Sequence, residues 1–224
     1  MTALLSVRKA VHSPARLLNL AVNELNLAFD STNQPGVFKN CKNLKKVEIK
    51  GNASFDTEAF KDCTSLESVI VKGKLCVNNG GIFIGGIGQS AFENCTSLET
   101  FKIYKMTCEG EGLSWYLGAK AFKNCKSLKT INIPNNCTGI YKEAFKNCIS
   151  LETVKISAKC EIFRIDDNGD KITSTLPNCY LQESAFENCY SLKTINIPKR
   201  FTHIEDKAFL NCYSLAEKYI DPYK

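Results

Sequence analysis

The residues of this chain that could take part in the widest range of chemistry are its twelve cysteines. Cysteines that hold a metal are commonly paired at Cys-x-x-Cys spacing, and the sequence contains no such pair. Seven cysteines instead stand three residues after a phenylalanine, and they are Cys41, Cys63, Cys95, Cys125, Cys148, Cys189 and Cys212. Free cysteine is often buried as a small apolar residue, and parallel Cβ vectors disfavour a disulfide. We predict a reduced, buried ladder, with Cys179, in an inserted segment, as the most reactive cysteine.

Other groups that could catalyse a reaction are sparse. Only two histidines occur, near opposite ends of the sequence, so a Ser-His or Cys-His pair has little basis. The stretch Asp166-x-Asn168-x-Asp170 resembles the start of a calcium loop. However, Lys171 stands where such a loop needs glycine, and Pro177 where it needs glutamate. We therefore expect a hairpin turn at this stretch, and for the chain no enzyme activity, no metal and no cofactor.

The cysteines belong to a sequence motif, Ala-Phe-x-Asn-Cys-x-Ser-Leu-x-x-Ile-x-Ile, that recurs seven times between residues 37 and 220. Its phenylalanines are Phe38, Phe60, Phe92, Phe122, Phe145, Phe186 and Phe209. Their shortest separations are 22 and 23 residues, and three separations are longer because extra residues are inserted. A period of this length lies within the range of leucine-rich repeats, in which each coil stacks on the next.

Each unit ends in alternating apolar residues, as in Leu128, Ile131 and Ile133. This spacing predicts one short strand per unit with one buried face. A further apolar position precedes each phenylalanine by five residues, and another follows each strand. The second set is Ala53, Cys76, Cys108, Cys137, Cys160 and Phe201. Stacked coils would place each buried residue on its equivalent in the next coil, so the predicted core consists of ladders.

The repeat, including its Ile133-Pro134 and Ile197-Pro198 endings, resembles the BspA-type leucine-rich repeat of bacterial and protist surface proteins. The resemblance covers about residues 36 to 220. It implies a curved solenoid with a parallel sheet on its concave face, and adhesion to or binding of host or matrix proteins. The sequence departs from the pattern at Val37, at the three insertions and at Lys218, which stands where the last strand should be apolar. Lys218 favours a capping role for the seventh unit.

Residues 1–35 lie outside the repeat. Ser13-Pro14 is typical of a helix start, and apolar residues follow at helical spacing, namely Leu17, Leu18, Ala21, Leu25 and Ala28. A helix here would cover the first coil; the alternative is a helix that binds a partner or a membrane surface, for which its basic face is thin. We predict a single domain, with a helical cap over residues 1–35 and a mainly β solenoid of seven units over residues 36–220.

The three insertions enter each unit at the same place and contain turn-forming residues at 78–81, 109–112 and 167–170. Asn-Gly between alternating apolar residues is a strong hairpin signal. We predict three β-hairpins along one edge of the solenoid. They either take part in binding or are surface decoration that a repeat protein tolerates.

The formal net charge is +6, and lysine alternates with glutamate through the repeats, which favours acidic partners only weakly. No apolar run could span a membrane, so no membrane insertion is expected. In residues 1–9 the basic residues follow the apolar run, which is the wrong order for a secretory signal. A cytoplasmic location therefore stands beside the surface or secreted location that the family implies, and we expect a monomer.

Strand alternation places threonine, lysine and asparagine on the outer side of the predicted sheet. We predict a non-catalytic module that binds a protein or glycan there, with an adhesive role by family resemblance. The predicted contacts are Lys102, Tyr104, Asn132, Lys155, Trp115 and Tyr116, because tyrosine and tryptophan are enriched in binding hot spots. For Trp115 the alternative is packing of its insertion onto the solenoid. The alternative function is polyanion or nucleic-acid binding by the lysines, which the scarcity of stacking aromatics disfavours.

Overall fold

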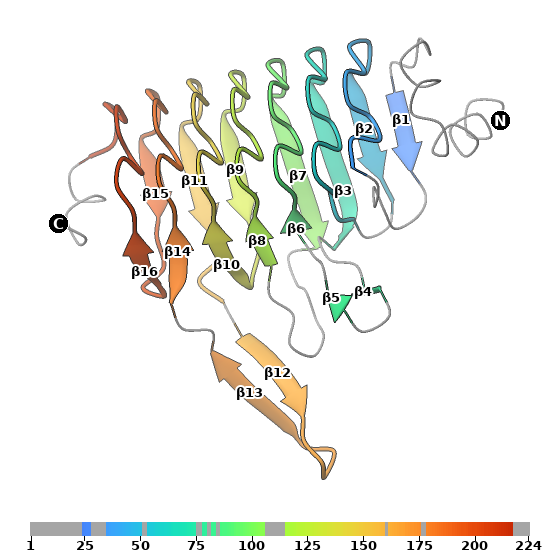
Figure 1. Cartoon of the computed structure of the whole chain (residues 1–224), viewed down its shortest axis with the longest axis vertical. Helices are drawn as coiled ribbons and strands as arrows, with labels where there is room; N and C mark the ends of the chain where they lie inside the picture. Colours follow the sequence, from blue (N-terminus) through green and yellow to red (C-terminus); the bar gives the residue numbers. More distant parts are fainter. Residues whose placement is uncertain are drawn as a thin grey trace.

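The computed structural model shows a stack of coils crossed by two parallel sheets, one of seven strands and one of five (Figure 1). It describes residues 24–27, 35–50, 53–74, 78–79, 82–83, 86–105, 115–159, 161–175 and 178–216. No helix occurs among these residues. Accordingly, no helix in the described part of the chain is long and apolar enough to cross a membrane.

The larger sheet has seven parallel strands, one from each successive coil. In spatial order they are β1 (Glu24–Leu27), β2 (Lys46–Ile49), β3 (Ser68–Lys74), β7 (Thr100–Lys105), β9 (Thr130–Ile133), β11 (Thr153–Ile156) and β15 (Thr194–Asn196). The register is the one that the repeat predicts, because equivalent residues face each other, as Thr130 faces Thr153. The predicted parallel sheet is confirmed.

A second sheet of five parallel strands lies on the other side of the coils, and the prediction of a single strand per unit is wrong for these units. The strands are β6 (Gly86–Ile87), β8 (Trp115–Leu117), β10 (Cys137–Ile140), β14 (Cys179–Leu181) and β16 (Phe201–Ile204). Each ends at the apolar position five residues before a repeat phenylalanine. Alternation such as Trp115-x-Leu117, buried at both ends, is the local signal for this short strand.

The N-terminal region departs from the predicted helix. Residues Glu24–Leu27 form β1, which pairs in parallel with β2 so that Leu25 faces Val47 and Leu27 faces Ile49. The prediction that Leu25 lies in a helix is therefore wrong. Leu25 and Leu27 alternate in step with Val47 and Ile49 of β2, as expected for a strand that extends this sheet by one. The rest of the predicted cap and Lys218 lie outside the described residues.

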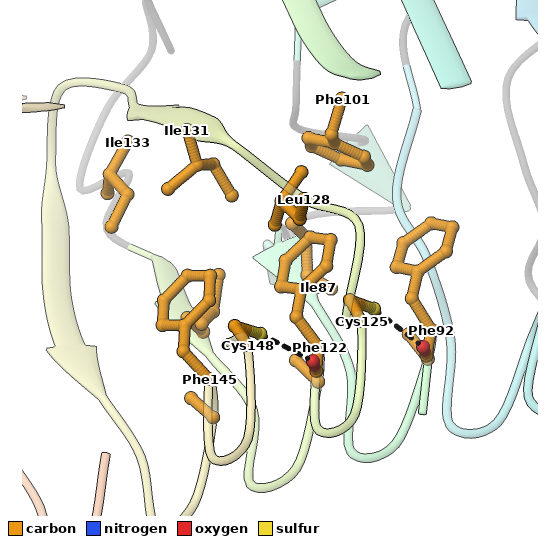
Figure 2. Close-up of a cluster of buried hydrophobic side chains, with 14 of the residues drawn as sticks. Ile87, Phe92, Phe101, Phe122, Cys125, Leu128, Ile131, Ile133, Phe145 and Cys148 are labelled. Atoms are coloured by element: carbon orange, nitrogen blue, oxygen red, sulfur yellow. Dashed lines mark hydrogen bonds between the residues drawn. The ribbon is translucent and has the colours of Figure 1, made fainter. Parts of the chain in front are cut away.

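A phenylalanine ladder forms the centre of the core and confirms the predicted stacking (Figure 2). The Phe122 ring lies 5.2 Å from that of Phe92 and 5.3 Å from that of Phe145, with the planes nearly parallel. Beside it, Phe101, at the first apolar position of β7, adds an edge-to-face contact with Phe122 at 5.0 Å. All four rings are buried, so each central coil is packed on both sides.

The cysteine ladder is buried as predicted, with the exception of half-buried Cys41, and it also has a polar function that the sequence reasoning missed. From Cys63 onward, each thiol of the ladder donates a hydrogen bond to the carbonyl of the phenylalanine one coil earlier, as Figure 2 shows for two of them. The distance is 3.2 Å from Cys125 to Phe92 and 3.1 Å from Cys148 to Phe122. The same carbonyls already accept the backbone N–H group three residues later, as Phe92 does from Cys95 at 3.1 Å, so the thiol adds a second hydrogen bond to each carbonyl.

A second ladder consists of the asparagines that precede the cysteines in the repeated motif. Asn124 donates to the side-chain oxygen of Asn94 at 2.7 Å, and Asn147 donates to Asn124 at 2.8 Å. These residues have φ near +62°, a left-handed conformation that asparagine adopts more readily than most residues. Asparagine thus makes the turn and links it to the turn of the neighbouring coil.

The insertions leave the coils at one edge. Strands β12 (Glu161–Ile165) and β13 (Lys171–Thr175) form an antiparallel hairpin that projects from the solenoid (Figure 1). Strands β4 (Asn78–Asn79) and β5 (Ile82–Phe83) form a shorter antiparallel pair. The turn predicted at residues 109–112 lies outside the described residues. At the tip of the long hairpin, the Asp166 carboxylate accepts the backbone N–H groups of Asn168 and Asp170, as expected for a turn.

Cys179 is not the accessible cysteine that the sequence predicts. It is 1% exposed, begins β14 and lies in register with Phe201 of β16. Cys179 therefore occupies the post-strand position for which the spacing predicts Cys160, a residue outside the described ones. The insertion ends before Cys179, and this explains why counting from the preceding strand leads to the wrong residue.

Candidate binding site

The outward side chains of the seven-stranded sheet form straight columns across the coils. We call this surface the long-sheet face and define it by two columns together with Lys72 and Tyr104, which follow the second column on β3 and β7. The first column is Lys46, Ser68, Thr100, Thr130, Thr153 and Thr194, and the second is Glu48, Ile70, Lys102, Asn132, Lys155 and Asn196. Because hydrogen-bonded strands hold these residues, their positions relative to one another are fixed.

Four of the predicted contact residues lie together on the long-sheet face. Lys102, Asn132 and Lys155 are exposed on β7, β9 and β11, and Asn132 pairs directly with Lys155. Tyr104, also on β7, is 59% exposed. The structure therefore brings these four residues to one surface over three neighbouring strands.

Lys72 is a further residue of this surface that the sequence reasoning did not single out. It lies on β3, and its Nζ is 4.7 Å from the centre of the Tyr104 ring. A lysine over an aromatic ring is attracted by the negative face of the ring. The signal was present, because Lys72 and Tyr104 stand at equivalent positions after the register pair Val71 and Ile103.

Trp115 does not belong to this surface, so its predicted contact role is wrong. The side chain is 2% exposed, and the indole Nε1 donates a 2.7 Å hydrogen bond to the Asn135 carbonyl. The first residue of β8 points into the coil, where Cys137 occupies the equivalent position in β10. The alternative considered for Trp115, packing onto the solenoid, is confirmed.

Tyr116 is 43% exposed, but it lies on the five-stranded sheet and not beside Lys102. There it stacks on Tyr141 at 4.8 Å between ring centres, while Tyr180 stacks on His203 at 4.9 Å. Burial raises the pKa of Tyr141. This aromatic row was not predicted, although Tyr116 and Tyr180 both immediately precede the leucine five residues before a phenylalanine.

The charged residues at the turns are mutually neutralised. Lys61 lies 3.0 Å from Glu93, Lys123 lies 2.7 Å from Glu143, and each pair joins neighbouring coils. The hydrogen bond to Glu93 raises the pKa of Lys61, and a second one to Glu58 adds to the effect. These pairs occupy much of the charge at the turn edge, where Lys42, Lys126 and Lys207 remain exposed with no carboxylate of the described residues within ion-pair distance.

The described residues offer no recognisable metal centre. Among them, no three His, Cys, Asp or Glu side chains are grouped so that they could hold a metal ion. The ring Nδ1 of His203, on β16, is 2.9 Å from the Thr202 hydroxyl. What the long-sheet face offers chemically is ammonium groups, amides, hydroxyls and one exposed aromatic ring.

Two parallel sheets around stacked phenylalanine, leucine and cysteine ladders define a leucine-rich-repeat solenoid. The family described as BspA type leucine rich repeat region, with six copies of the repeat, matches residues 29–110 and 86–216. The chain therefore belongs to the BspA-type leucine-rich-repeat family. Leucine-rich-repeat proteins are in general non-catalytic scaffolds that bind protein partners. No curated protein matches the chain.

Solved bacterial structures share the fold. A leucine-rich repeat protein from Bacteroides ovatus is 24% identical, with a TM-score of 0.56, over 86% of this chain and 44% of its own. The Treponema pallidum (T. pallidum) leucine rich repeat protein is 17% identical, with a TM-score of 0.59, over 91% of this chain and 82% of its own. The chain thus spans less than half the length of the B. ovatus protein.

Proposed function

We propose that this protein is a non-catalytic module that binds a protein or glycan partner on the long-sheet face, in an adhesive role at a cell surface. The observation that carries the proposal is that Lys102, Tyr104, Asn132 and Lys155 are exposed together on three neighbouring strands. The family supports the binding role, because leucine-rich repeats in general hold protein partners.

The rigidity of the strands supports the choice of this surface. A side chain on a hydrogen-bonded strand loses less conformational freedom on binding than one on a loop. The side chains of Thr194 and Thr153 are themselves hydrogen-bonded, at 3.2 Å between their hydroxyl oxygens. Tyr104 adds a large ring with few rotatable bonds, a residue type that is common in binding hot spots.

Photocrosslinking from defined positions tests this proposal while the partner is still unidentified. A photoreactive phenylalanine analogue replaces Lys102, Lys126 or Tyr116, which lie on the long-sheet face, the turn edge and the five-stranded sheet. Each variant is irradiated in a mixture of cell-surface and matrix proteins and glycans. We expect one specific product from position 102 and none from the other two positions.

The partner identified in the product is then purified, and its affinity for Lys102→Ala/Tyr104→Ala/Asn132→Ala/Lys155→Ala is measured. The fold of this variant is checked by circular dichroism. A folded quadruple variant should bind at least about tenfold more weakly, which corresponds to about 1.4 kcal/mol. Crosslinks that form only from position 116 or 126 would show that the partner binds elsewhere.

A further inference from the structure

The lysines of the described residues differ in their partners. Seven of them lie within 2.7 to 3.9 Å of a glutamate carboxylate in a neighbouring coil or their own, and they are Lys39, Lys45, Lys61, Lys123, Lys142, Lys146 and Lys193. Seven lysines in described residues are thus matched by acidic side chains. Their charge is neutralised within the molecule.

Three lysines on β3, β7 and β11 have no such match. Lys72, Lys102 and Lys155 are exposed, and no carboxylate of the described residues lies within ion-pair distance of them. In the two columns that define the face, Glu48 on β2 is the only acidic residue. The nearest approach to a partner is that of Lys72 to the Tyr104 ring.

Because Lys72, Lys102 and Lys155 have no carboxylate partner, they give the long-sheet face an uncompensated positive charge. Charges of one sign on a surface add to a field that attracts and orients an oppositely charged partner. Strands are about 4.8 Å apart. Lys102 and Lys155 are separated by two strand steps, which corresponds to about 10 Å, or roughly three residues of an extended peptide.

We infer that the partner segment seated on the long-sheet face is an acidic polypeptide, extended across β3, β7, β9 and β11, with carboxylates that meet Lys72, Lys102 and Lys155. This inference rests on the proposed function and specifies its partner. Asn132 and the threonines of the first column supply the donors and acceptors that an extended backbone requires. Half-buried Ile70, on β3, offers the same segment an apolar contact.

The residue types on the face favour a polypeptide over other polyanions. Lysine ammonium groups attract carboxylates and phosphates alike, so the other side chains of the face decide between these partners. Single-stranded nucleic acids need several aromatic rings for stacking, whereas Tyr104 is the only exposed aromatic residue in the described strands of this sheet. A carboxylate is well served by a single ammonium group.

Fluorescence anisotropy with a defined probe tests the inference. The probe is a labelled peptide of about twelve residues with glutamate at every third position, a length that spans the four strands. The same peptide with glutamine is the matched probe, and labelled heparin and a thymidine oligonucleotide represent the other polyanions. Binding is measured at low and at physiological ionic strength.

Two charge-matched variants accompany the wild type. Lys72→Gln/Lys102→Gln/Lys155→Gln removes three charges from the face, and Lys42→Gln/Lys126→Gln/Lys207→Gln removes three from exposed turn positions. We expect the glutamate peptide to bind the wild type and the turn variant alike. The face variant should bind about tenfold more weakly and with a shallower salt dependence.

Several outcomes would overturn the inference. Equal affinity for the glutamine peptide would mean that charge is not recognised, and equal loss in both variants would mean that only net charge matters. Preferential binding of heparin or the oligonucleotide by Lys72, Lys102 and Lys155 would assign the face to another polyanion, and no peptide binding at roughly millimolar concentration would exclude an acidic polypeptide. In each case crosslinks from position 102 would still uphold the proposed function, while crosslinks elsewhere would reject it.

Discussion

At the scale of single residues, six cysteines of the repeat add a second hydrogen bond to the buried phenylalanine carbonyl of the preceding coil. The Cys212 thiol, for example, donates to the Phe186 carbonyl at 3.1 Å. Burial raises the pKa of Cys212 to about 12 from an ordinary value of 9.0. The coil therefore keeps a proton that the unfolded chain loses in alkali.

This pKa shift predicts a pH dependence of stability. A folded pKa that lies above the unfolded one contributes stability that is fully present below about pH 9 and lost as the pH rises towards 12. Between these values each such cysteine lowers the free energy of unfolding by about 1.4 kcal/mol per pH unit. Urea titrations at several pH values should show this slope, reduced by one cysteine in Cys212→Ser. An unchanged slope in that variant would refute the assignment.

The phenylalanine ladder makes a second prediction at this scale. Phe145 is fully buried between Phe122 and Phe186, whereas Phe209 is half-buried and stacks only on Phe186 in the described coils. Phe145→Ala should lower the free energy of unfolding by about 3 to 5 kcal/mol. Phe209→Ala is the matched control and should cost clearly less. Equal losses in urea unfolding would contradict a ladder in which each ring is supported from both sides.

At the scale of elements, spacing predicted those strands whose side chains repeat in every coil. The long sheet follows from Leu-x-x-apolar-x-apolar, which places Lys102, Asn132 and Lys155 on its outer face. The second sheet was missed because its strands are short and three of them, β6, β8 and β14, follow insertions of different lengths. The same uncertainty in register assigned Trp115 to the surface and Cys179 to a loop, since neither can be placed by counting from the preceding strand.

The β12–β13 hairpin is an element whose strands pair only with each other. A two-stranded hairpin by itself is marginally stable and contributes little to the ladders. Replacing residues 161–175 with a short turn should therefore lower the melting temperature less than Phe145→Ala does. Differential scanning calorimetry of both variants makes the comparison. A hairpin deletion that is the more damaging of the two would mean that the insertion supports the solenoid.

At the scale of the whole molecule, the two sheets present different chemistry. The long-sheet face combines unmatched lysines with Tyr104, while the five-stranded sheet carries the stacked rings of Tyr116, Tyr141, Tyr180 and His203. At the turn edge between them, several lysines are paired with glutamates of neighbouring coils. This distribution of charge leaves the long-sheet face as the surface on which a partner would gain most from electrostatic attraction.

The measurement that tests the central claim most directly is the affinity of two folded variants for the purified partner that crosslinking identifies. One is Lys102→Ala/Tyr104→Ala/Asn132→Ala/Lys155→Ala, and the control is Tyr116→Ala/Tyr180→Ala on the other sheet. Surface plasmon resonance should show at least about a tenfold loss for the quadruple variant and wild-type affinity for the control. Unchanged affinity of the quadruple variant, with a loss in the control, would contradict the account and place the binding site on the five-stranded sheet.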